Sequence, residues 1–288
     1  MNQYLFALRN IFDKFIQVIN SPETFKFYWQ TYILSGFNTL EPDVYFVSYP
    51  KCGRTWLRFM LQQYLELCGS NTQQFKDKFY LGLPGGQIIK FEHDQGSWVL
   101  APLRIDRLSF NVSKYIERKV IFMARDPRDV LVSSWYHLKF RERTYRGSLS
   151  EFIRDDLVGI HKVVSFMNMW LENSHIPDDF FLITYEQLHS DPLTSFHRLL
   201  DFIGIAVSYS ALQTAVEEGS FEKMKRMELK GTLKEPWMKP GSKDLRNSMK
   251  IRRGKVGSFY EELSEEDIEF LNGVIQNKLS SKLPYHQH

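Results

Sequence analysis

Cysteine is nearly absent from this chain, since Cys52 and Cys68 are the only two among 288 residues. Two cysteines cannot build a disulfide framework, and so low a content is typical of a reducing compartment. The sequence also lacks any apolar run near the ~20 residues that cross a bilayer, and residues 1–20 lack the uninterrupted apolar core of a signal peptide. We therefore expect a soluble, cytoplasmic protein that does not associate with membranes.

A large net charge is absent as well, because 37 Lys and Arg face 34 Asp and Glu, a formal charge of +3. This balance hides an uneven distribution. Residues 223–255 hold twelve Lys or Arg and three acidic residues, net +9, whereas the rest of the chain has 25 against 31, net −6. A concentrated positive field attracts anions, so we expect the basic segment to lie beside an anionic ligand.

The composition leaves little room for disorder, because 15% of the residues are aromatic and 43% are hydrophobic. A chain of this length buries about three quarters of its unfolded surface. We predict a single domain over residues 1–288. Apolar residues recur at helical spacing over residues 1–20, which predicts an amphipathic helix docked on the core.

Short apolar runs alternate with helical patterns along the chain. The runs predict strands over residues 44–49, 88–91, 119–124 and 180–184. Helical periodicity predicts helices over residues 55–67, 127–139, 158–173, 192–203 and 265–279. This order predicts an α/β fold with a P-loop-like central parallel sheet flanked by helices on both faces. Residues 231–250 have little periodicity and predict a long lid loop near the C-terminus.

The strongest local signal is the segment Tyr49-Pro50-Lys51-Cys52-Gly53-Arg54-Thr55-Trp56, which joins the first predicted strand to the first predicted helix. The N–H groups at a helix N-terminus are unpaired and carry the positive end of the dipole, so they favour a phosphate. Lys51 can reach the same phosphate, and Thr55 can donate its hydroxyl. The Gly-Lys-Ser/Thr ending of a Walker A loop is absent. On these residues alone, an ordinary strand–turn–helix connection is an equal interpretation.

Two further segments place cations where ligands gather in open α/β sheets. Arg125 follows the strand predicted over residues 119–124, and Ser133 comes eight residues later, two turns into the next helix. A salt bridge from Arg125 to Asp129 is the alternative interpretation. Nearer the C-terminus, the segment Arg252-Arg253-Gly254-Lys255-Val256-Gly257 groups three cations around two glycines that allow close backbone approach.

Together these segments resemble the sulfotransferases that use 3'-phosphoadenosine 5'-phosphosulfate (PAPS), in their single-domain cytosolic or bacterial small-molecule branch. That family has Tyr-Pro-Lys-Ser/x-Gly-Thr-Thr-Trp in the loop, matched by residues 49–56, an Arg and a Ser eight apart, and Arg-Lys-Gly-x-x-Gly, matched by residues 252–257. Residues 184–188 are similar to its Tyr-Glu-x-Leu motif and residues 220–224 to its Ser-Phe-x-x-Met motif. The five motifs follow the family's order and cover roughly residues 40–260.

The resemblance implies a site for PAPS, with 3'-phosphoadenosine 5'-phosphate (PAP) as the product. It implies that the loop binds the 5'-phosphosulfate, that Arg125 and Ser133 bind the 3'-phosphate, and that aromatic residues contact the adenine. The implied cofactor-binding residues are Lys51, Cys52, Gly53, Arg54, Thr55, Trp56, Arg125, Ser133, Tyr185, Phe221, Arg252, Arg253 and Gly254.

The resemblance also implies the reaction, an in-line transfer of the sulfuryl group to a hydroxyl or amine of a small-molecule acceptor (EC 2.8.2 type). Lys51 would hydrogen-bond the bridging oxygen as the 5'-phosphate leaves. His93 matches the family's general base, and the ordinary near-neutral pKa of histidine suits proton removal. Asp94 or Glu92 could instead orient or replace it. No metal is required, and the sequence has no convincing His/Cys/Asp ligand cluster.

One departure concerns a second cation. The family often has Lys two residues before the base, a position that Phe91 occupies here, so that cation is either missing or supplied from elsewhere. The acceptor is not defined by the sequence. Candidate acceptor-pocket residues, by position only, are Tyr28, Trp29, Tyr32, Phe37, Tyr80, Trp98, Tyr136, His137 and Trp237.

Two other functions stay open at this point. One is a nucleotide kinase or another phosphate-loop enzyme, which the missing Walker A ending and the pair of Arg125 and Ser133 oppose. The other is a non-catalytic nucleotide-binding module, or a nucleic-acid binder that uses the basic segment. The order of the motifs favours an enzyme with a small-molecule acceptor and no nucleic acid. The oligomeric state is not defined.

Overall fold

The computed structural model of the chain describes residues 41–70, 75, 79–96, 104–233 and 245–286. The helix predicted over residues 1–20 lies outside these residues, and so do residues 234–244 of the predicted lid loop. Among the helices that the structure describes, none combines the length and the apolar character needed to span a bilayer.

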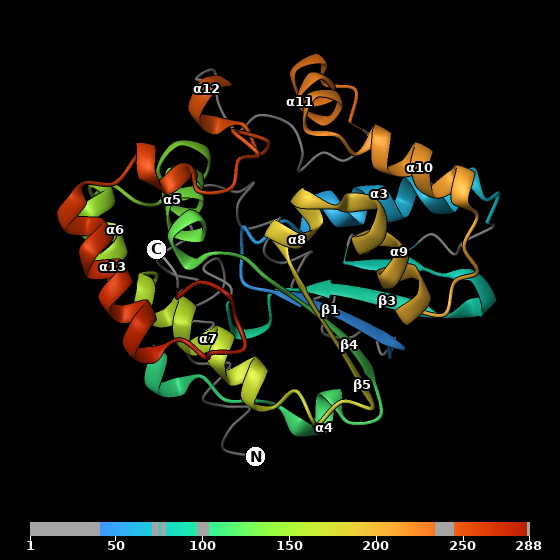
Figure 1. Cartoon of the computed structure of the whole chain (residues 1–288), viewed down its shortest axis with the longest axis horizontal. Helices are drawn as coiled ribbons and strands as arrows, with labels where there is room; N and C mark the ends of the chain where they lie inside the picture. Colours follow the sequence, from blue (N-terminus) through green and yellow to red (C-terminus); the bar gives the residue numbers. More distant parts are fainter. Residues whose placement is uncertain (1–40, 71–74, 76–78, 97–103, 234–244, 287–288) are drawn as a thin grey trace, which may run out of the picture.

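A five-stranded, mostly parallel sheet forms the centre of the molecule (Figure 1). Its strands are β1 (Val44–Ser48), β2 (Tyr80–Gly82), β3 (Ile88–Glu92), β4 (Lys119–Ala124) and β5 (Asp179–Thr184), in the order β2-β3-β1-β4-β5. β1 pairs in parallel with β3 and β4, and β4 pairs in parallel with β5. The four predicted strands and the α/β class are confirmed. β2, which pairs antiparallel with β3 as the outermost strand on that side of the sheet, is not among the predicted strands.

Burial explains why the central strands are continuously hydrophobic. Every residue of β1 is buried, and so is every residue of β4 after Lys119. Layers of helices cover both faces of these strands, so a side chain on either face must be apolar. Val47 and Phe122, paired neighbours in β1 and β4, have no solvent exposure.

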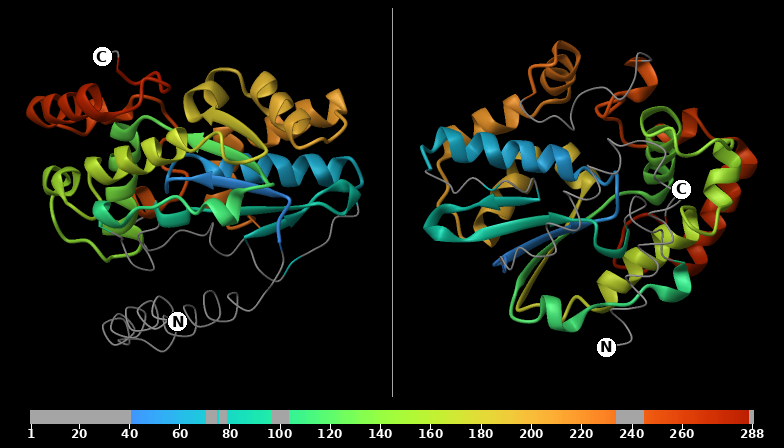
Figure 2. Two further views of the ribbon diagram at one scale, coloured as in Figure 1. Left: turned by 90° about the horizontal axis from the view of Figure 1, so that it is seen from below. Right: turned by 180° about the vertical axis from the view of Figure 1, so that it is seen from behind.

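Eleven α-helices lie in the described part of the chain: α3 (Arg54–Leu67), α4 (Val112–Tyr115), α5 (Pro127–Tyr136), α6 (Leu149–Arg154), α7 (Ile160–Glu172), α8 (Tyr185–Ser190), α9 (Pro192–Phe202), α10 (Tyr209–Glu218), α11 (Phe221–Lys230), α12 (Leu245–Ser248) and α13 (Glu265–Lys278). α3 contacts α10, which also packs on α9, while α5 and α13 both pack on α7. These two groups lie on opposite sides of the strands (Figures 1 and 2). The predicted flanking of both faces is confirmed.

The order of the strands predicts a crevice at the carboxyl ends of the parallel strands. β1 lies between β3 and β4. After β1 the chain forms β2 and β3 on one side of it, and then crosses over to form β4 and β5 on the other side. Such a reversal separates the loops that follow neighbouring strands and opens a ligand site at their carboxyl ends. The carboxyl ends of β1, β3, β4 and β5 lie at the same end of the sheet because all four strands run parallel.

Helix α5 carries one irregularity that bears on the site. It starts with Pro127 after the N-cap Asp126, whose side chain accepts the N–H of Arg128. The prediction extended the helix to residue 139, but the chain changes to a π-helical turn over His137–Arg141. Such turns are frequent at functional sites because they shift side chains out of regular register.

Candidate active site

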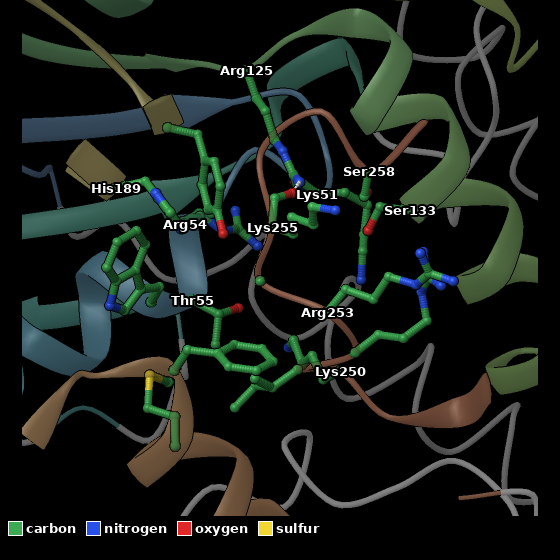
Figure 3. A pocket seen from close by; sticks show the side chains of 18 of the residues that line it. Lys51, Arg54, Thr55, Arg125, Ser133, His189, Lys250, Arg253, Lys255 and Ser258 are labelled. Atoms are coloured by element: carbon green, nitrogen blue, oxygen red, sulfur yellow. Dashed lines mark hydrogen bonds between the residues drawn. The ribbon is translucent and has the colours of Figure 1, made fainter. Parts of the chain in front are cut away.

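A cavity of about 440 Å³ lies at the carboxyl ends of the parallel strands (Figure 3). Its lining includes a residue from just beyond each of these strands: Lys51 after β1, His93 after β3, Arg125 after β4 and Tyr185 after β5. Its volume lies within the range of about 300–1,000 Å³ that is usual for small-molecule sites. The cavity therefore lies where the strand order predicts a ligand-binding site.

The cavity brings together nearly all the residues predicted from the sequence. Those that line it are Lys51, Gly53, Arg54, Thr55, Trp56, His93, Arg125, Ser133, Tyr185, Phe221, Arg252, Arg253 and Gly254. Cys52 is not among the lining residues, because its side chain is fully buried in the hydrophobic core. Burial also raises the pKa of the Cys52 thiol, which disfavours a thiolate there.

The loop between β1 and α3 has a backbone shaped for an anion. Lys51 has a positive φ of 72° and Gly53 one of 104°. A Cβ at Gly53 would lie 2.7 Å from the Tyr185 ring and 2.8 Å from the Met123 side chain, so only glycine fits. α3 has neither a side-chain N-cap nor an acidic residue in its first turn. This helix N-terminus therefore suits a negatively charged ligand.

Lys51 lies at the centre of a group of cations. Burial, followed by the charges of Arg141 and Arg125, lowers the pKa of Lys51 to about 7. A bound phosphate would oppose these effects and favour the charged amine. The protonation state of Lys51 is thus sensitive to an anion in the cavity.

Arg125 joins three segments that are distant in the sequence. Its guanidinium donates to the main-chain carbonyl of Lys51 at 3.3 Å and to that of Lys255 at 3.2 Å. It also lies 3.4 Å from the carboxylate of Asp129, which accepts the N–H of Gly257 at 2.9 Å. The salt bridge considered from the sequence is present, and Arg125 still lines the cavity. The ion pair therefore positions Arg125 as part of the site.

Aromatic rings form one wall of the cavity. The rings of Trp56 and Tyr185 meet edge to face at 5.5 Å, and the Arg125 guanidinium lies 4.2 Å from the centre of the Tyr185 ring. The indole N–H of Trp56 donates to the carbonyl of Gly219 at 2.7 Å, which fixes its orientation. Phe221, the first residue of α11, completes this wall. Its rings and cations suit a flat heteroaromatic base.

The segment after α12 brings more cations to the cavity. The guanidinium of Arg252 stacks 3.7 Å from the centre of the Tyr136 ring and donates to Glu262 at 3.0 Å. Arg253 lies 2.8 Å from the same carboxylate. Figure 3 shows Lys51, Ser133, Arg253 and Lys255 around one space. Glu262 holds both guanidinium groups in place while they still line the cavity.

The hydrogen bonding of His93 defines its tautomer. Nδ1 lies 2.9 Å from the main-chain carbonyl of Ser48, and a carbonyl only accepts, so Nδ1 carries the proton. Burial, followed by the charge of Arg54, lowers the pKa of His93 well below its ordinary value. The ring is therefore neutral near pH 7, with a lone pair on Nε2. This is the state that a general base requires.

The two acidic neighbours of His93 have other partners. Glu92 accepts the hydroxyl of Tyr115 at 2.7 Å and pairs with the amine of Lys114 at 2.6 Å. Asp94 lies 3.7 Å from the same amine. Neither carboxylate is among the residues that line the cavity. Of these three residues, only His93 lines the cavity.

Lys250, His189 and Ser258 are not among the site residues predicted from the sequence, yet all three line the cavity. His137 lines it as well, from the π-helical turn. Burial, followed by the Lys51 charge, lowers the pKa of His137 to about 4. His137, named from the sequence as an acceptor-pocket candidate, follows Ser133 by one helical turn. Among the described residues, no three His, Cys, Asp or Glu side chains could together hold a metal ion.

The acceptor-pocket candidates divide into two groups. His137 lines the cavity, Tyr136 lies beneath Arg252, and Tyr80 belongs to β2. The others lie outside the described residues: Tyr28, Trp29, Tyr32, Phe37, Trp98 and Trp237.

Comparison with known proteins identifies the class. The profile of the family described as "Sulfotransferase domain" matches residues 41–282, so the chain belongs to this family and is a sulfotransferase. The chain is 25% identical over 281 residues to cytosolic sulfotransferase 17 of Arabidopsis thaliana, covering 87% of this chain and 80% of that protein. It is 29% identical over 236 residues to human sulfotransferase 2B1, covering 76% of this chain and 61% of that protein.

Solved structures agree in fold. A mouse sulfotransferase crystallised with PAP has a TM-score of 0.59 at 20% identity, covering 85% of this chain and 87% of that one. A retinol dehydratase crystallised with androsterone and the inactive cofactor PAP has a TM-score of 0.62 at 19% identity, covering 88% of each chain. At these identities, the likeness concerns the fold.

Proposed function

We propose that the protein transfers the sulfuryl group of PAPS to a hydroxyl or amine of a small-molecule acceptor and releases PAP. The observation that carries this proposal is the lining of the cavity. Among the described lining residues, seven are Lys or Arg and one, Glu222, is acidic. These cations lie beside an aromatic wall and a neutral His93. That combination suits a nucleotide with phosphate groups on two sides of its ribose.

The loop after β1 would bind the 5'-phosphosulfate. The first N–H groups of α3 have no side-chain cap, and the hydroxyl of Thr55 lines the cavity beside them. Lys51 would donate to the bridging oxygen and stabilise the charge that develops on the leaving phosphate. Arg54 adds a further donor to the same end of the cavity.

The residues beyond β4 would bind the 3'-phosphate. Arg125 and Ser133 both line the cavity, from the end of β4 and from α5. Arg252 and Arg253 bring two more guanidinium groups, whose planar donors suit phosphate oxygens. Trp56, Tyr185 and Phe221 would enclose the adenine, since aromatic side chains bind nucleobases by stacking on their flat faces.

His93 would take the proton of the acceptor. The acceptor oxygen or nitrogen forms a bond to sulfur while the bond from sulfur to the bridging oxygen breaks, and the proton moves to Nε2 of His93. The departing oxygen keeps the electron pair, next to Lys51. The fixed position of His93, set by its bond to Ser48, serves to align the attack.

The comparisons support a small organic acceptor and a cytoplasmic setting for this reaction. A relative with a similar fold was crystallised with androsterone, and other relatives are named cytosolic sulfotransferases. Both described cysteines are free thiols, in keeping with a reducing compartment. The identity of the acceptor is best approached by mass spectrometry, as a gain of about 80 Da for a transferred sulfuryl group.

A thermal-shift experiment tests the donor site without an acceptor. PAP at 100 times its Kd should raise Tm by roughly 5–10 °C, whereas ATP or ADP with magnesium should raise it far less. The reason is that only PAP carries a phosphate on each side of the ribose.

The variant Arg125→Ala should lose most of the PAP-induced rise in Tm. Its matched control is Arg118→Ala, because Arg118 pairs with Glu41 and does not line the cavity. Stabilisation by ATP with magnesium but not by PAP would support a nucleotide kinase. A response to PAP without any sulfated product from a broad acceptor panel would support a non-catalytic module.

Gly254→Ala should weaken PAP binding at least tenfold. Gly254 has a φ of 61°, and a Cβ there would lie 2.1 Å from the ring of Phe221, so the ring that would enclose the adenine must move. Isothermal titration of PAP measures the effect. The control is Gly273→Ala in α13, where a Cβ meets nothing within 4 Å. Equal PAP affinities in both variants would contradict a role of Phe221 and Gly254 at the base.

A further inference from the structure

Lys250 is a lysine in the cavity to which the mechanism above gives no task. It lies two residues before Arg252, in the segment that follows α12, and lines the same cavity as Lys51 and His93. Figure 3 labels it among the side chains that surround the cavity. Its side chain therefore borders the cavity in which the proposed reaction would take place.

A buried carboxylate fixes the backbone at Lys250. Glu228, on α11, is 1% exposed and accepts the N–H of Lys250 at 2.7 Å and that of Ile251 at 2.8 Å. Two adjacent N–H groups held by one carboxylate leave the main chain little freedom to turn. The side chain of Lys250 is thus presented to the cavity from a fixed point, in spite of its place beside a long connection.

Lys250 interacts electrostatically with both catalytic candidates, Lys51 and His93. After burial, the charges that lower the pKa of Lys250 belong to Lys51, Arg141 and Arg54. The charge of Lys250 in turn helps to lower the pKa of His93. Lys250 is therefore within electrostatic reach both of the lysine on the leaving side and of the base on the acceptor side.

Sulfuryl transfer creates a need for a cation at that point. As the bond to the bridging oxygen breaks, negative charge lies on the sulfuryl oxygens as well as on the leaving phosphate, and fixed donors stabilise both. Lys51 has its task on the leaving side. Phe91, two residues before His93, is an apolar side chain packed against Phe46 in the core and supplies no charge.

We propose that Lys250 is a catalytic residue that binds the sulfuryl oxygens of the donor between Lys51 and His93, and that Glu228 is its positioning residue. This inference rests on the proposed function. It assigns Lys250 to the one part of PAPS that PAP lacks. Comparing the two ligands therefore isolates the contact.

Titration of PAPS and of PAP into the same variants tests the assignment without knowledge of the acceptor. Lys250→Met should raise the Kd of PAPS about tenfold, the usual effect of losing a charge-assisted hydrogen bond, and change that of PAP less than about twofold. Lys250→Arg should restore most of the PAPS affinity. Lys223→Met is the control, because it removes a charge from α11 that pairs with Glu217 and does not line the cavity.

The binding of PAP also shows that each variant is folded around the donor site. If Lys250→Met weakens PAP and PAPS equally, Lys250 contacts a phosphate and the assignment is wrong. Unchanged affinity for both ligands would exclude any contact. Glu228→Gln should reproduce the selective loss in part, since its amide holds the backbone of Lys250 less firmly. Failure of the proposed function would be seen separately, as wild-type protein that forms no sulfated product.

Discussion

His93→Ala is expected to lower turnover by about 10²–10⁴-fold while leaving the affinity for PAP within about twofold of the wild-type value. His93 is held by its Nδ1 proton to the carbonyl of Ser48, so that Nε2 is the free base. Removing the ring removes the proton acceptor but none of the groups that would hold the phosphates. The measurement is release of PAP from PAPS in the presence of an acceptor identified by mass spectrometry.

The pH profile gives a second check on His93. A base is active when neutral, and the pKa of His93 is lowered well below its ordinary value by burial and by Arg54. Turnover of the wild-type enzyme should therefore hold as pH falls through 6.5 and decline only at lower pH. His197→Ala, which changes a half-exposed histidine outside the cavity, should match the wild type. Retention of substantial turnover by His93→Ala would assign the base to another residue.

Lys51→Met is expected to lower turnover by about 10²–10³-fold, the usual effect of removing one donor from a developing negative charge. The donor-side cations Arg54 and Arg125 remain in this variant, so PAP should still bind, though more weakly. Single-turnover measurement of PAP release separates the chemical step from binding. Lys278→Met, on the last turn of α13, serves as the control. A loss of affinity without any loss in the chemical step would make Lys51 a binding residue only.

The lowered pKa of Lys51 also predicts that the protein takes up a proton when PAP binds. In the ligand-free protein its pKa is about 7, so at pH 8 most of the amine is neutral. A phosphate favours the charged form and raises this pKa, so binding at pH 8 draws a proton from the buffer. Affinity should accordingly fall as pH rises above 7. Calorimetry in buffers of different ionisation enthalpy should detect the uptake, and Lys51→Met should reduce it.

The central sheet could be predicted because burial on two faces leaves a continuous apolar run, as in β1 and β4. β2 could not, since three residues give no recognisable pattern. Helix α8 was missed although its signal was present: Thr184 and Gln187 form a capping box at its N-terminus. Helix α11 was missed for a different reason. It buries only Met224 and Glu228, so its apolar spacing is sparse.

Site residues divide in the same way. Those in contiguous motifs, such as Lys51 in its loop and Arg253 beside Gly254, could be located from the sequence because the local backbone carries the signal. Lys250 could not. Its place is set by Glu228, which lies 22 residues earlier in the chain and belongs to another helix. A contact of this kind leaves no spacing or periodicity in the sequence, so only the folded structure reveals it.

The hydrogen bonds of Arg125 also set a length. One guanidinium is tied to the carbonyls of Lys51 and Lys255, and thereby fixes the span between the loop that begins α3 and the C-terminal cations. Under the proposed function, a ligand that bridges this span would be selected by the separation of its two anionic groups and not by its total charge. A triphosphate has more charge, all of it on one side of the ribose, so under the proposed function it should bind more weakly than PAP. The site would thus distinguish nucleotides by the distance between their phosphate groups.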